Sequence, residues 1–140
     1  MAKKSNRAFA WAQTVPVDVF RCGVCFLVGK DVNELRKAFV CVTRRCRWDG
    51  VGPSGYFDRV MAECERKGSF KGITVALDGD PDKVVWLPEW DEGVFVHECV
   101  HAADLILRDK EVEDVRGEML AYLTEHFYLK FMEGKEKWRR

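Results

Sequence analysis

The sequence predicts one α+β domain in which helices pack against a small β-sheet, and three observations lead to this prediction. Residues 17–28 are dense in β-branched and aromatic side chains, which favours a strand. Residues 73–77 and 83–88 are two further β-rich runs around an Asp-Gly connection, which predicts a hairpin. Several other segments repeat apolar residues at spacings of three and four, the period of a helix. The expected order is strand, helix, helix, hairpin, helix, helix.

The composition is typical of a single globular domain. The chain has 140 residues, 47% hydrophobic and 33% charged, which is enough to bury a core without disulfide bonds. Basic and acidic residues balance at 23 each, so no net charge attracts nucleic acid or an anionic membrane. Basic residues do gather at both ends, where we expect them to be solvated rather than to bind nucleic acid.

The sequence also predicts where the protein resides. No apolar run reaches the roughly 18 residues that a membrane span needs. The first residues lack the charged, apolar and small-residue order of a secretion signal. We therefore expect a cytoplasmic protein whose six cysteines are reduced. The sequence does not predict an oligomeric state.

The first half of the domain is expected to contain an arm, a strand and a helix. Residues 1–15 are basic and then rich in alanine and aromatic side chains, and we interpret them as a basic N-terminal arm. The strand over residues 17–28 follows. Asp31 or Asn33 can then cap a helix that runs to about residue 45.

A loop and a second helix separate this region from the hairpin. Glycine and proline cluster in residues 49–55, which makes this segment the clearest predicted loop. A short helix is expected over residues 56–67, and Gly68 ends it. If the second hairpin strand, residues 84–87, lies at an edge of the sheet, an extended peptide can pair with it.

Two helices complete the predicted domain. Asp91 is a suitable cap for a helix that runs to about residue 108. Residues 109–112 form a charged link. The last helix is expected over residues 114–132, with an apolar face that packs on the rest of the domain.

The pentad His97-Glu98-Cys99-Val100-His101 is the strongest functional signal in the chain. On a helix, residues four apart lie on the same face, so His97 and His101 can bind one Zn²⁺ through their imidazoles. Glu98 can reach a water on that metal and take its proton as general base. Cys99 is most simply a packing residue.

A catalytic zinc site needs a third protein ligand, and we predict Glu118 in the last helix. Glu125 and His126, two turns further on, are the reserve candidates. Asp104 is a further possibility, either as that ligand or as a carboxylate that orients a zinc-bound histidine. The alternative to both roles is that Asp104 forms a simple ion pair with Arg108, four residues later.

Tyr122 is one turn after Glu118 and shares its helix face. Its phenol can donate a hydrogen bond to the oxyanion that forms when water attacks a carbonyl. The competing interpretation is an aromatic side chain that packs with its hydroxyl at the surface.

The remaining cysteines allow a second metal site. Cys22 and Cys25 form one pair and Cys41 and Cys46 another, at a spacing found in four-cysteine zinc modules. Residues three apart on a strand face opposite sides, however. We therefore treat these cysteines as core thiols and keep a structural zinc as the alternative.

The pentad followed by a glutamate on a second helix resembles the gluzincin branch of the zincin metallopeptidases. The segments VVWLPEW, HECVHAADLIL and GEMLAYLTEHF also resemble small proteins encoded in bacteriophage and prophage genomes. The resemblance spans residues 73–131. It implies a minimal zincin-like core, a hairpin packed on the active helix, with His97, His101 and Glu118 as zinc ligands and Glu98 as general base. Larger gluzincins carry an aspartate four residues after the ligand glutamate, where this chain has Tyr122.

The sequence therefore predicts a zinc-dependent metallopeptidase that acts on a peptide or protein substrate. The alternative is a zinc-stabilised binding or assembly module, of phage origin and without catalytic activity.

Overall fold

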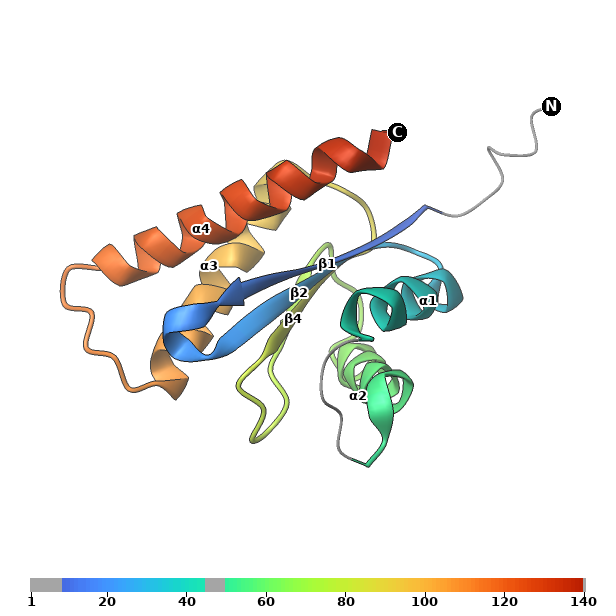
Figure 1. Ribbon diagram of the computed structural model, residues 1–140, viewed down its shortest axis with the longest axis horizontal. Helices are drawn as coiled ribbons and strands as arrows, with labels where there is room; N and C mark the ends of the chain where they lie inside the picture. Colours follow the sequence, from blue (N-terminus) through green and yellow to red (C-terminus); the bar gives the residue numbers. More distant parts are fainter. Residues whose placement is uncertain (1–8, 45–49, 140) are drawn as a thin grey trace.

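The computed structural model has a mixed four-stranded β-sheet with two helices on each face (Figure 1). It describes residues 9–44 and 50–139. The elements in chain order are β1 (Ala10–Val17), the 3-10 turn η2 (Asp18–Phe20), β2 (Cys22–Gly29), α1 (Val32–Thr43), α2 (Gly52–Arg66), β3 (Ile73–Val75), β4 (Lys83–Leu87), α3 (Glu92–Asp109), α4 (Glu118–Lys135) and η3 (Glu136–Arg139). The predicted α+β class is confirmed.

The sheet order is β1-β2-β4-β3, which places β1 and β3 at the two edges. The β1–β2 and β3–β4 pairs are antiparallel, and the central β2–β4 pair is parallel. The predicted hairpin is thus confirmed as β3 and β4. Our suggestion that its second strand is an edge is wrong, because β4 pairs with β2 on one side and β3 on the other.

The N-terminal region differs from the prediction. Residues 10–15, expected in an arm, belong to β1, and residues 17–28, expected as one strand, span a turn and most of β2. The chain reverses at η2, and Arg21 takes a left-handed backbone conformation with φ 53°. Val19 and Phe20 lie within this reversal and continue the β-rich composition, so the composition alone did not separate the two strands. Residues 1–8 lie outside the described residues.

Two helix starts also differ from the prediction. α2 begins at Gly52, inside the predicted loop, with a proline in its first turn, where the missing N–H of proline costs nothing. α4 begins at Glu118 rather than near Asp114. The Asp114 side chain instead accepts hydrogen bonds from the backbone N–H groups of Met119 and Leu120 at 3.1 and 2.9 Å.

The two faces of the sheet bury separate apolar clusters. β2 residues alternate between them: Phe26 faces α3 and α4, while Leu27 faces α1 and α2. The Phe26 ring packs against Phe95 of α3 at 5.2 Å between ring centroids and against Phe131 of α4 at 5.3 Å. This aromatic cluster fixes α3 on the sheet. No helix within the described part of the chain is long and apolar enough to cross a membrane.

The predicted caps of α1 and α3 are present. Asp31 accepts hydrogen bonds from the N–H groups of Asn33 and Glu34. Asp91 accepts one from the N–H of Val94 at 3.1 Å, which satisfies a donor that the helix itself leaves free.

Replacing Asp91 by alanine is expected to lower the free energy of unfolding by about 1 kcal/mol, because α3 loses this cap. Urea denaturation of the parent and the variant measures the change. Asp91→Asn keeps an acceptor oxygen and serves as the control, since asparagine is an equally good cap. Equal stability of the alanine variant and the parent would show that the cap contributes nothing.

Candidate metal centre

The pentad lies in the first half of α3, and its residues face different surroundings. Phe95 and Cys99 are completely buried in the core. His97 and His101 are exposed on the opposite side of the helix. This separation follows from the helical period, which turns residues two apart by about 200°. Packing of the apolar stripe therefore presents both imidazoles to solvent.

The two imidazoles converge as the spacing predicts. The Nε2 atoms of His97 and His101 lie 3.1 Å apart, with the ring planes inclined at 76°. Two nitrogens bound to one zinc ion at about 2.05 Å and the tetrahedral angle would lie about 3.3 Å apart. The pair therefore fits two corners of a zinc coordination tetrahedron.

The Glu98 side chain lies against the edge of the sheet, beside the start of β3. Its side chain is 6% exposed. Thr74 on the edge strand β3 donates a hydrogen bond from Oγ1 to Glu98 Oε1 at 2.7 Å. A buried carboxylate needs such a partner, and the bond fixes the side chain in one orientation.

Glu98 and His97 nevertheless border the same hollow on the protein surface. Its other lining residues are Lys71, Gly72, Gly93 and Val94. A Cβ at Gly72 would lie 2.6 Å from Val94 Cγ1 and 3.0 Å from Glu98 Cγ. Glycine at this position therefore leaves the space in which the Glu98 side chain lies.

The structure does not bring Glu118 to the histidines. α4 packs on the flank of α3 that carries Glu92 and Phe95. Tyr128 donates a hydrogen bond to Glu92, and the tilted rings of Phe131 and Phe95 pack with their centroids 4.4 Å apart. The hollow at His97 opens on the other flank, beside β3. Within residues 9–44 and 50–139, no three His, Cys, Asp or Glu side chains gather closely enough to hold a metal ion.

The other candidates on α3 and α4 have different partners. Asp104 forms an ion pair with Arg108, Oδ2 to Nε, at 3.0 Å, which is the alternative interpretation of this residue. Glu125 is exposed on α4. His126 donates from Nε2 to the carbonyl of Pro16 at 2.9 Å. Tyr122 is 57% exposed, and its ring stacks on the ring of His126 at 6.2 Å.

Within the part of the chain that the structure describes, the cysteines do not gather into a metal site. Cys22 and Cys25 are buried in opposite clusters of the sheet, as the strand period predicts, and Cys41 is exposed on α1. Cys46 lies outside the described residues. Cys99 is buried, and desolvation raises its pKa to about 12. Its thiol therefore stays protonated at neutral pH and acts as a packing group, as expected.

Sequence analysis missed Thr74 and Gly72. Both flank the start of β3, 24 and 26 residues before Glu98, and only the pairing of edge strand and helix makes them neighbours. The one available signal was a threonine between two buried strand residues, Ile73 and Val75.

Comparisons with protein-family models, with curated proteins and with solved structures gave no match.

Proposed function

We propose that this protein is a zinc-dependent hydrolase that cleaves peptide bonds, with His97 and His101 as metal ligands and Glu98 as general base. The 3.1 Å separation of the two Nε2 atoms is the observation that carries the proposal. Two imidazole nitrogens this close on a solvent-exposed helix face suit a divalent metal of the zinc type.

In this reaction the metal, Glu98 and Thr74 would each have a separate role. A zinc ion held by His97 and His101 would supply a water of lowered pKa and would polarise the scissile carbonyl. Glu98 takes the proton of the attacking water and passes it to the leaving amine. Thr74 holds one carboxylate oxygen, Oε1, which leaves Oε2 for the proton.

The edge strand β3 suits an extended peptide substrate. It pairs with β4 on one side only, and Thr74 on this strand bonds Glu98. A peptide that adds to the free side of β3 by main-chain hydrogen bonds would pass beside the general base. This replaces the second hairpin strand, predicted from the sequence, as the surface that aligns the substrate.

Zinc titration tests the ligand assignment. His97→Ala and His101→Ala are each expected to weaken zinc binding by at least about 100-fold, since even groups that only orient a ligand account for 10- to 100-fold. Isothermal titration calorimetry measures the affinity, and His126→Gln is the control because His126 bonds Pro16 instead. Unchanged zinc affinity in the two alanine variants would contradict the assignment.

The same titration tests Glu118. If Glu118 is the third ligand, Glu118→Gln weakens zinc binding while Glu125→Gln does not, and α4 must move relative to α3 when zinc binds. If both variants bind zinc as the parent does, another group or water fills the remaining positions.

The second candidate function is a zinc-binding module without hydrolytic activity. It is favoured by one observation: among the described residues, two zinc donors gather rather than three. Zinc binding without cleavage of any peptide substrate would support this candidate.

A further inference from the structure

His97 and His101 lie on a face of α3 that another molecule can reach. Both residues are exposed, and the neighbouring Val96 and Val100 are 37% and 38% exposed. Helix α4 packs on one flank of α3, and the hollow beside β3 opens on the other. We call the surface formed by these four side chains the histidine face. A second protein surface can approach both of its imidazoles directly.

The histidine face supplies half of a zinc coordination shell. Structural zinc sites hold the ion with four protein side chains in a tetrahedron. The 3.1 Å separation of the two Nε2 atoms fits one edge of that tetrahedron. Among residues 9–44 and 50–139, no third His, Cys, Asp or Glu side chain lies close enough to join them. Two coordination positions are thus left for donors from outside this part of the chain.

A second copy of the chain carries the two donors that complete the tetrahedron. A twofold axis through the metal turns the edge formed by His97 and His101 into the opposite edge, so two copies place four imidazoles around one ion. Twofold dimers are the commonest protein assemblies, because each copy offers the same surface to the other. The two imidazoles of each copy already converge, so the ion has little side-chain order to impose when it binds.

The tetrahedron also sets how the two copies of α3 meet. The edge between His97 and His101 follows the axis of α3, because residues four apart on a helix lie one above the other. Opposite edges of a tetrahedron are perpendicular, so the two helices would cross at about 90°, an uncommon but known crossing. Each helix then passes over a flank of the other. The hollow of about 420 Å³ on that flank leaves room, because two of its lining residues are Gly72 and Gly93.

We propose that a single Zn²⁺ joins two copies of this chain, bound by His97 and His101 of each copy. The inference rests on the zinc ligands of the proposed function but not on hydrolysis. The ion contributes most of the stability of the dimer, because two exposed valines per copy cover far less area than the roughly 1,200 Å² that a stable interface buries. Without zinc the chain is a monomer.

The dimer has a consequence for the proposed hydrolysis. A zinc ion held by four imidazoles has no position for water. Cleavage of a peptide therefore requires the two copies to separate, which makes the dimer a resting form of the hydrolase.

Sedimentation velocity of the full chain tests the dimer, with zinc chloride as the only added ligand. In a chelator we expect the mass of one chain, 16.2 kDa. One zinc ion for every two chains should double this mass, and calorimetry should give the same ratio. A monomer that binds one zinc ion per chain would overturn the dimer and leave the proposed function intact. A chain that binds no zinc would overturn both. A dimer that persists in the chelator would show that zinc does not join the copies.

Variants and X-ray absorption locate the ligands. His97→Ala should stay monomeric at the zinc concentration that makes the parent a dimer. His126→Gln is the control and should dimerise as the parent does, because His126 bonds Pro16. The zinc absorption spectrum of the dimer should show four imidazole nitrogens at about 2.0–2.1 Å. A His97→Ala variant that still dimerises with zinc, or a dimer whose zinc has only two imidazole ligands, would overturn the assignment.

Discussion

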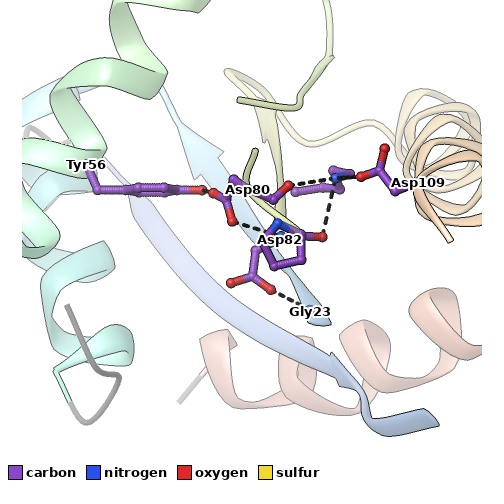
Figure 2. Close-up of polar contacts among 7 residues, drawn as sticks. Gly23, Tyr56, Asp80, Asp82 and Asp109 are labelled. Atoms are coloured by element: carbon purple, nitrogen blue, oxygen red, sulfur yellow. Dashed lines mark hydrogen bonds and ion pairs between the residues drawn. The ribbon is translucent and has the colours of Figure 1, made fainter. Parts of the chain in front are cut away.

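Replacing Asp109 by alanine is expected to lower the free energy of unfolding by about 3 kcal/mol. Lys83, at the start of β4, is only 1% exposed, and Asp109 at the end of α3 is the one charged partner of its ammonium group among the described residues. Figure 2 shows this ion pair beside the β3–β4 loop. Without it, the carbonyls of Asp80 and Pro81 remain, and a buried cation is left without its ion-pair partner.

Urea denaturation at pH 7 measures the loss, and the chain offers a matched control. Asp104, on the same helix, has a side chain 41% exposed, against 46% for Asp109, but its partner Arg108 is 75% exposed. Asp104→Ala should therefore cost less than about 0.5 kcal/mol. Lys83→Met should cost less than Asp109→Ala, because it leaves no buried charge. Similar losses for Asp104→Ala and Asp109→Ala would contradict the proposed role of the buried lysine.

Glu98→Gln is expected to reduce peptide hydrolysis by about 10²- to 10⁴-fold, the contribution of a general base. Glutamine keeps the oxygen that accepts the Thr74 hydrogen bond, so the fold and the side-chain position should persist. Zinc affinity should stay close to that of the parent, because we propose Glu98 as the general base and not as a ligand. The loss would then lie in the proton transfer and not in metal binding.

Cleavage of a peptide library, with and without a chelator, measures this effect. Glu125→Gln, an exposed change on α4, is the control and should cleave as the parent does. A Glu98→Gln variant that cleaves at the parental rate would exclude Glu98 as the base. Cleavage by the parent that a chelator does not reduce would exclude a metal-dependent reaction. Zinc binding by a parent that cleaves nothing would favour the non-catalytic module.

Local chemistry made parts of the fold predictable. Asp31 and Asp91 cap α1 and α3 as expected, because a cap depends on residues within one helical turn. β3 and β4 pair as the two β-rich runs predicted. Strand β1 was missed because the Asp18–Phe20 turn contains neither glycine nor proline, and a single aspartate is a weaker turn signal than those residues.

In the candidate site, too, the features set by local sequence were predictable and those set by tertiary packing were not. The approach of His97 to His101 depends on one helical turn and follows from their spacing. The position of Glu118 depends on which flank of α3 receives α4. Apolar periodicity identifies the buried stripe of each helix but not the flank on which the next helix packs. The contact between Phe95 and Phe131, a matter of tertiary packing, sets the flank of α3 on which α4 lies.

The parallel pairing of β2 with β4 has a consequence for how the chain folds. Each hairpin joins strands that are close in sequence, but Val24 lies opposite Lys83, 59 residues later (83 − 24). Closing so long a loop costs chain entropy before any contact repays it. We therefore expect the two hairpins to form early. The pairing of β2 with β4 at the centre of the sheet should then limit the folding rate. Substitutions at Val85, in the middle of that seam, should then slow refolding more than they speed unfolding.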